Sequence, residues 1–112
     1  AENHMKIVWV LVNCNGAAEA RKIGTSVLHK RLAACFDIFD RRGAWYFWPP
    51  RSGKIEHSKG CQLVLATLPK HVRSIRPIVQ RLHSDKLPFI GTLEIGAISA
   101  GYLKWMKDEL KS

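Results

Sequence analysis

The sequence has no long hydrophobic run. Its longest uninterrupted apolar stretch covers residues 7–12, whereas a helix that spans a bilayer needs about 20 apolar residues. It also lacks the pattern of an export signal, which is a charged segment, an apolar segment and a cleavage site. We therefore expect a protein that neither crosses a membrane nor carries an export signal.

Cysteines are few, and the common catalytic motifs are missing. The three cysteines are an odd number without close spacing, so they do not form a disulfide framework. Reduced thiols in a cytoplasmic protein fit this pattern better. No Gly-rich phosphate loop, H-E-x-x-H or G-x-S-x-G is present. These absences lead us to predict that the protein is not an enzyme.

Basic residues outnumber acidic ones. The 18 Lys and Arg against 9 Asp and Glu give a formal net charge of +9, which suits a polyanionic partner. The basic residues are dispersed along the sequence, however, with the densest groups at Arg41-Arg42 and over residues 70–81. Dispersed charge is typical of a soluble surface. A basic nucleic-acid-binding module is therefore our alternative interpretation, and we expect nucleic acid not to be the partner.

The order of the predicted elements indicates the fold. Residues 6–12, with a continuous apolar run over residues 7–12, are typical of a central strand, and helical spacing follows over residues 17–32. Two β-rich arms, residues 34–48 and 54–68, flank a Pro/Gly/Ser turn and predict one long hairpin. A helix starting at Pro69, a strand over residues 87–98 and a helix over residues 100–110 complete the chain.

This order is an α+β, ferredoxin-like β-α-β-β-α-β arrangement with an added C-terminal helix. We expect one domain over residues 5–112. Residues 1–4, which precede Met5, look like a remnant of an expression vector.

Cysteine and histidine side chains are the candidate ligands for a soft or borderline metal ion. None of them has the close spacing of a preformed cage, and small buried thiols with solvated histidines are the plain alternative. We expect Cys14 and Cys35 to lie at the same end of the sheet, with a strand between them. A catalytic thiol–histidine pair is a further alternative. The candidates are Cys14, Cys35, Cys61, His29, His57, His71 and His83.

A set of short segments gives the sequence a resemblance to known proteins. These segments are Lys30-Arg31-Leu32-Ala33-Ala34-Cys35, Ile38, Trp45-Tyr46-x-Trp48, Gly53-Lys54-Ile55-Glu56, Leu82-His83, Pro88 and Tyr102-Leu103-Lys104-Trp105. With them, the sequence resembles the CutA divalent-cation tolerance family over nearly all of residues 6–110. The resemblance implies a PII-like homotrimer linked to tolerance of divalent metals, especially copper, and to small-ligand signalling.

The resemblance also implies which residues form the sites. Cys35 matches a cysteine of the family, so we predict weak Cu(II) binding through Cys35 together with His83, without a closed four-ligand cage. The expected trimer interface and cleft residues are Trp45, Trp48, Lys54, Glu56, Tyr102 and Trp105.

Departures from the family pattern affect the cleft between subunits. The family has H-P-Y-x-x-P-E after the second helix, but here Ser84 and Asp85 follow His83, and Phe89 ends the segment. Ala66 replaces a lysine at the end of the third strand. We expect a more apolar cleft that binds anionic ligands poorly, because a buried charge needs a partner.

The long hairpin supports the trimer that the resemblance implies. Its arms exceed the usual strand of about 5–6 residues, so they expose backbone groups that need a partner. Trp45, Phe47 and Trp48 add apolar area beside these edges. Closure of three copies into a ring would satisfy the backbone and cover the aromatic rings.

Overall fold

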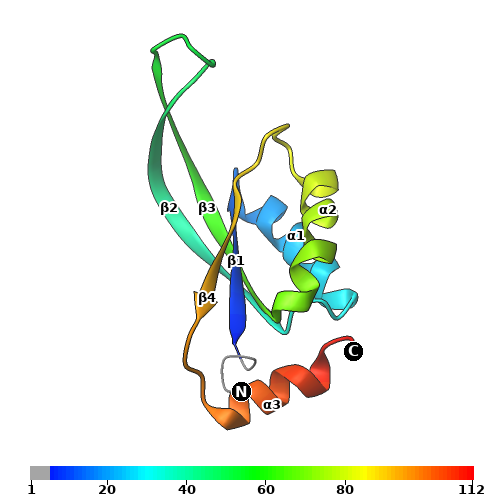
Figure 1. The fold of residues 1–112 in the computed structure, drawn as a ribbon. Coiled ribbons are helices and arrows are strands. Elements are labelled where there is room, and N and C mark those ends of the chain that lie inside the picture. Colours follow the sequence, from blue (N-terminus) through cyan, green and yellow to red (C-terminus); the bar gives the residue numbers. More distant parts are fainter. Residues whose placement is uncertain (1–5) are drawn as a thin grey trace.

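A computed structural model of the protein describes residues 6–112; the vector remnant expected at residues 1–4 lies outside them. Within the described range, one four-stranded sheet has the order β2-β3-β1-β4, and every neighbouring pair is antiparallel. The predicted ferredoxin-like α+β fold with an added C-terminal helix is confirmed (Figure 1). The elements are β1 (Ile7–Cys14), α1 (Ala17–His29), β2 (Cys35–Phe47), β3 (Ile55–Thr67), a short 3₁₀ turn η2 (Pro69–His71), α2 (Val72–Leu82), β4 (Ile90–Ile95) and α3 (Ala100–Glu109).

The main core lies between the sheet and the helices α1 and α2. β1 is flanked by β3 and β4, so its predicted central place is confirmed. Alternate residues of a strand face opposite sides of a sheet, and the even-numbered residues of β1 point toward the helices. They pack there against the apolar faces of α1 and α2. The buried residues of this cluster include Val8, Val10, Val12, Ile23, Val27, Leu63, Leu65, Ile75 and Val79.

The opposite face of the sheet is only partly covered. α3 packs across its lower end, where Ile7 and Ala66 of the sheet meet Leu103 and Met106 of the helix. Above α3, three large side chains remain in solvent: Trp9 is 39% exposed, Leu93 52% and Phe39 56%. Exposed apolar side chains of this size are typical of a surface that a partner covers.

The β2–β3 hairpin projects beyond the rest of the domain (Figure 1). Its strands are paired from Cys35 and Ala66 to Phe47 and Ile55, with a register shift between Arg41 and Ala44. The bulge predicted near residues 40–43 is therefore confirmed. The projection makes the molecule long, with extents of 48 × 26 × 23 Å and a radius of gyration of 15.3 Å. A compact domain of this length has a radius of gyration of about 13 Å.

Candidate metal centre and contact surfaces

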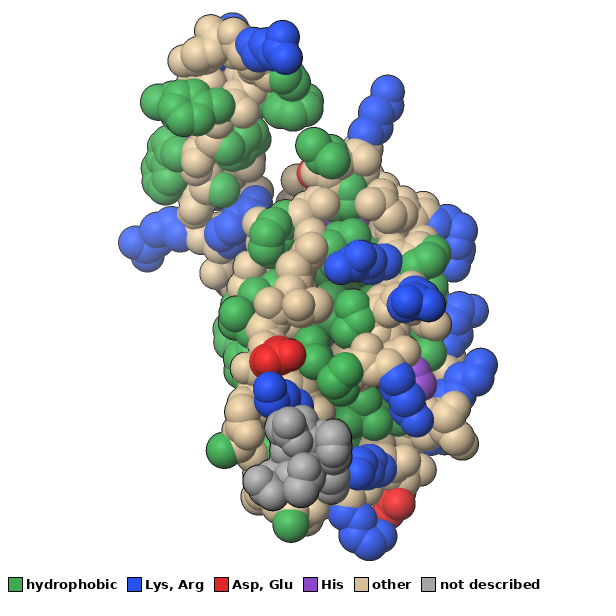
Figure 2. Space-filling view, in the orientation of Figure 1, with side chains coloured by type: hydrophobic (Ala, Val, Ile, Leu, Met, Phe, Trp, Pro, Cys, Tyr) green, Lys and Arg blue, Asp and Glu red, His purple; other side chains and the backbone are tan. Residues whose placement is uncertain are grey.

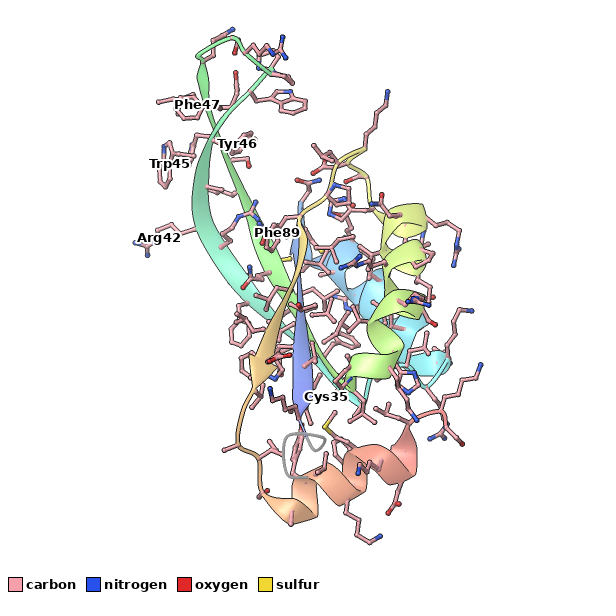
Figure 3. The ribbon with its side chains drawn as sticks, viewed as in Figure 1. Cys35, Arg42, Trp45, Tyr46, Phe47 and Phe89 are labelled. Atoms are coloured by element: carbon pink, nitrogen blue, oxygen red, sulfur yellow. The ribbon has the colours of Figure 1, made fainter. Side chains whose placement is uncertain are left out.

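The two predicted metal ligands lie far apart in the chain. Cys35 begins β2 and is paired with Ala66, which is also the partner of Trp9 on β1. Figure 3 shows Cys35 at the end of the sheet beside α3. The His83 Nε2 instead lies 2.6 Å from the carbonyl oxygen of Asn13. Trp9 and Asn13 are separated by about 13 Å of strand. One chain therefore does not place Cys35 and His83 around the same ion.

The expectation that Cys14 and Cys35 share one end of the sheet is wrong. β1 and β2 are both antiparallel to β3, so they run in the same direction. The end of β1 and the start of β2 consequently lie at opposite ends. Cys14 is paired with Cys61, whereas Cys35 is paired with Ala66.

His83 lies close to the thiol of Cys14 rather than to that of Cys35. The Cys14 sulfur, a Glu19 carboxylate oxygen and a His83 ring nitrogen all lie within 4.8 Å of one another. Cys14 ends β1, Glu19 is in the first turn of α1, and His83 directly follows α2. The βαβ order brings these three element ends together. Thiolate, imidazole and carboxylate are the donors that zinc and related divalent ions take in proteins.

Glu19 ties the loop after α2 to the start of α1. One of its carboxylate oxygens accepts a hydrogen bond from the Asn15 amide at 2.9 Å, and the other from the Ser84 amide at 2.7 Å. Burial raises the pKa of Glu19, but the hydrogen bonds from Ser84 and Asn15 outweigh it, and the pKa falls below its ordinary value. The carboxylate is therefore ionised at neutral pH, as a metal ligand must be.

His83 has a fully buried side chain and a defined tautomer. Its Nδ1 accepts a hydrogen bond from the Asp85 amide at 2.9 Å, so Nδ1 carries no proton. Nε2 then carries the proton and donates it to the Asn13 carbonyl oxygen. The ring in this arrangement is a neutral imidazole, which is the form that binds metals. It could bind an ion through Nδ1 if the hydrogen bond from the Asp85 amide is broken, or through Nε2 if the proton moves to Nδ1, which breaks the same hydrogen bond.

The Cys14 thiol holds its proton strongly. Burial, followed by the nearby Cys61 and Glu19, raises the pKa of Cys14 to about 12. A metal ion must displace this proton to reach the sulfur. It must also compete with the hydrogen bonds of Glu19 and His83. The site is therefore suited to weak, reversible binding.

Sequence reasoning considered Cys14 as a ligand but preferred Cys35, and it missed Glu19. The signal that would have found them is topological. In a β-α-β unit with parallel strands, the end of the first strand meets the start of the following helix. The second helix runs back to that same end, which places His83 beside Cys14 and Glu19.

Cys35 contacts an aromatic pair on α3. Its sulfur lies 3.5 Å from the Tyr102 hydroxyl, and Tyr102 meets Trp105 edge-to-face with ring centroids 5.3 Å apart. The hydrogen bond with Cys35, followed by burial, raises the pKa of Tyr102 to about 12. Trp105 also lines an open pocket of about 610 Å³ between α1 and α3, with Arg31 and Glu109 on its other walls.

The predicted interface residues form two groups at opposite ends of the folded molecule. Trp45, Trp48, Lys54 and Glu56 lie toward the hairpin tip, whereas Tyr102 and Trp105 lie on α3 (Figures 1 and 3). Trp45 is 68% exposed and stacks on His57, with ring centroids 4.4 Å apart. Trp48 is half exposed. Contact between the two groups therefore requires a second copy of the chain.

The residues that replace the family's cleft motif are also divided. Ser84, Asp85 and Phe89 lie near the end of β1, where Asn15 donates side-chain hydrogen bonds to Ser84 and Asp85 and the Asn13 amide donates to the Phe89 carbonyl. Ala66 is buried at the other end of the sheet, against α3. No single cleft within the described residues contains all four.

Comparison with known proteins identifies the family. Residues 8–109 match the family described as CutA1 divalent ion tolerance protein. The chain belongs to this family.

Similar sequences and structures agree with that assignment. The chain is 34% identical over 99 residues to a CutA homolog of Danio rerio, covering 88% of this chain but only 64% of that protein. It is 30% identical over 92 residues to the divalent-cation tolerance protein CutA of Pyrococcus horikoshii, covering 82% and 86%. The structure of the periplasmic divalent cation tolerance protein CutA from Archaeoglobus fulgidus superposes with a TM-score of 0.87 at 25% identity, covering 94% and 99%. None of the helices in residues 6–112 has the length and apolar character needed to cross a membrane.

Proposed function

We propose that this CutA1-family protein binds a divalent transition-metal ion, with copper preferred, at Cys14, Glu19 and His83, and that it serves metal tolerance without catalysing a reaction. The observation that supports this most directly is the convergence of three different donor types within 4.8 Å at the meeting point of β1, α1 and α2. The family's description as divalent ion tolerance proteins points in the same direction.

Copper is the ion that this donor set favours. For a given set of nitrogen, oxygen and sulfur ligands, affinity among first-row divalent ions is highest for Cu(II). The buried thiol and imidazole supply one soft and one borderline donor, and Glu19 supplies negative charge. Because protons and hydrogen bonds must be displaced first, we expect modest affinity.

Calorimetric titration with Cu(II) tests the site. Cys14→Ser should weaken binding at least tenfold, because it removes the sulfur donor and leaves the neighbours in place. Cys35→Ser is the matched control, since Cys35 lies at the other end of the sheet, and its affinity should equal that of the wild type. Loss of binding in Cys35→Ser with retention in Cys14→Ser would transfer the site to Cys35.

We further propose that three copies form a closed ring. The hairpin tip and α3 lie at opposite ends of the folded molecule, and each exposes aromatic side chains. A head-to-tail contact would therefore pair Trp45 and Trp48 of one copy with Tyr102 and Trp105 of the next. A contact between unlike surfaces closes into a ring or continues into a fibre. The exposed sheet face with Trp9, Phe39 and Leu93 would be covered by the same assembly.

Light scattering measures this directly. The wild type should give roughly 38 kDa, three times the 12.7 kDa of one chain. Trp48→Asp should lower the mass because it places a charge within the proposed contact. Gln80→Asp on the exposed side of α2 is the control and should leave the mass unchanged. A wild-type mass near 12.7 kDa excludes the ring.

The remaining parts of the proposal concern ligands and location. With Ser84, Asp85, Phe89 and Ala66 in place of the family's polar residues, a cleft between copies should bind nucleotides and carboxylates poorly. Signalling through a ligand in this cleft would then need an apolar or neutral molecule.

The three free thiols favour a cytoplasmic location, which fractionation of the source cells would test.

A further inference from the structure

Basic residues that are dispersed in the sequence gather on one side of the fold. Residues 17–34 and 69–86, which comprise α1, η2, α2 and their flanking loops, contain nine of the 18 Lys and Arg but only Glu19 and Asp85 as acidic residues. Figure 2 shows Lys and Arg side chains, in blue, along the side of the molecule that the helices form in Figure 1. The nine are Arg21, Lys22, Lys30, Arg31, Lys70, Arg73, Arg76, Arg81 and Lys86.

This positive charge is not neutralised within the chain. All nine basic residues are exposed, and among the described residues only Arg31 of the nine forms an ion pair, with Glu109 at 3.0 Å. The two acids are already engaged: Glu19 accepts backbone hydrogen bonds, and Asp85 accepts one from the Asn15 side chain at 3.0 Å. The helix side therefore presents a large positive field to solvent.

The spacing on α2 aligns part of this charge. Residues three and four apart share one face of a helix, so Arg73 and Arg76 lie together, and Arg81 lies about 12 Å along the axis from Arg73. α1 packs beside α2 against the same sheet face and adds Arg21 and Lys22. This side is opposite the exposed Trp9 and Leu93, so an assembly formed through the sheet would leave it free.

The chemistry of the surface selects the kind of partner. No large hydrophobic side chain of α1 or α2 is exposed in the described chain. A helix lying on a membrane inserts an apolar face, but that face of α2 is buried in the core through Ile75, Ile78 and Val79. Single-stranded nucleic acid needs aromatic side chains for base stacking, and these helices offer none. The partner that fits this surface is therefore a duplex with regularly spaced phosphates, because phosphates bind basic side chains through charge and counterion release alone.

We propose that the outer side of α1 and α2 binds the phosphate backbone of duplex nucleic acid without reading its sequence. This goes beyond metal tolerance and does not rest on the metal site. It also reverses the sequence-based expectation, which treated the basic residues as dispersed. The fold gathers them on one side.

Fluorescence anisotropy with a labelled 20-base-pair DNA duplex and metal-free protein tests the proposal. Binding should weaken at least tenfold between 50 and 200 mM salt. The double variant Arg73→Glu with Arg76→Glu should lower affinity at least tenfold and reduce the salt slope by about 2, since each phosphate contact contributes about 0.9. The substituted positions are exposed, so circular dichroism should stay unchanged.

A matched control separates local from total charge. Arg42→Glu with Lys59→Glu, both exposed on the hairpin below its tip, changes the net charge equally and should alter affinity less than threefold. If both double variants lost affinity for the duplex equally, net charge alone would explain the binding, and the proposal would be overturned. It would also be overturned by no duplex binding at 50 mM salt, or by tighter binding to vesicles with 30% phosphatidylserine or to single-stranded DNA.

Discussion

Replacing Glu19 with glutamine tests the element junction that holds the candidate metal centre. Glu19 is only 15% exposed, and its two carboxylate oxygens accept the backbone amides of Asn15 and Ser84. Glutamine keeps one acceptor oxygen but turns an amino group toward the other amide. That amide loses its partner, and both contacts lose the carboxylate charge.

The expected cost follows from the two hydrogen bonds. Hydrogen bonds to charged groups contribute about 1.5–3 kcal/mol. Because Asn15 and Ser84 are exposed, water can take the place of the lost acceptor, and we expect a loss of about 1.5 kcal/mol. With an unfolding entropy of about 2.1 cal/mol/K per residue, this lowers the melting temperature by roughly 6 °C.

The stability difference between wild type and Glu19→Gln should decrease as the pH is lowered. The pKa of Glu19 is lowered in the folded state, so its contribution is fully present above the unfolded-state pKa of about 4.3. It is lost as the pH falls through the folded-state pKa. The gap between wild type and Glu19→Gln should therefore be largest at pH 7 and should shrink below about pH 4.

Thermal unfolding followed by circular dichroism at fixed protein concentration measures the gap. Glu94→Gln is the control, because Glu94 pairs with Lys6 on the surface, where ion pairs contribute about 0–1 kcal/mol. A melting point within 2 °C of the wild type for Glu19→Gln at pH 7 would refute the reasoning. A gap that stays constant from pH 7 to pH 3 would refute its electrostatic part.

Two further predictions concern packing and titration. A Cβ at Gly24 would lie 2.6 Å from Cγ of Phe36, whereas one at Gly101 meets nothing within 4 Å. In urea unfolding, Gly24→Ala should therefore lower the free energy of unfolding by about 1–3 kcal/mol through overpacking, and the control Gly101→Ala should leave it unchanged or raise it by up to about 1 kcal/mol. A Gly24→Ala variant more stable than the wild type would contradict the close contact. In a Tyr46→Phe background, absorbance at 295 nm should show Tyr102 ionising near pH 12, and the protein should lose stability as the pH rises from about 10 to 12. Cys35→Ala should move the midpoint of this titration toward pH 10. An unmoved midpoint would exclude Cys35 as the main cause of the raised pKa of Tyr102.

The fold was predictable because its signals are local. The continuous apolar run of β1 marked the central strand, and the two long arms around residues 49–53 marked the hairpin, including its bulge. The ends of β4 were less accurate: the strand covers Ile90–Ile95, shorter than the predicted residues 87–98. Of the flanking apolar residues, Ile98 packs against the cluster beside α3, whereas Leu87 is exposed. Sequence pattern alone does not distinguish either residue from a continuing strand.

The candidate site was less predictable because it depends on which element ends meet in space. His83 was identified from its motif, but its neighbours Cys14 and Glu19 are 69 and 64 positions away in the sequence. Cys35 was chosen as its partner because it matches a cysteine of the family, but the strand pairing places Cys35 at the other end of the sheet. Likewise, Arg21 and Arg73 belong to separate segments, and only the packing of α1 beside α2 makes them one surface.

Native mass spectrometry of the wild type with Cu(II) tests the central claim most directly, because it counts subunits and bound ions together. We predict a complex of roughly 38 kDa that carries one copper ion per subunit. Cys14→Ser should give the same complex without copper, and Cys35→Ser should give the complex with copper retained. A single-chain mass of 12.7 kDa, or copper retained by Cys14→Ser, would contradict it.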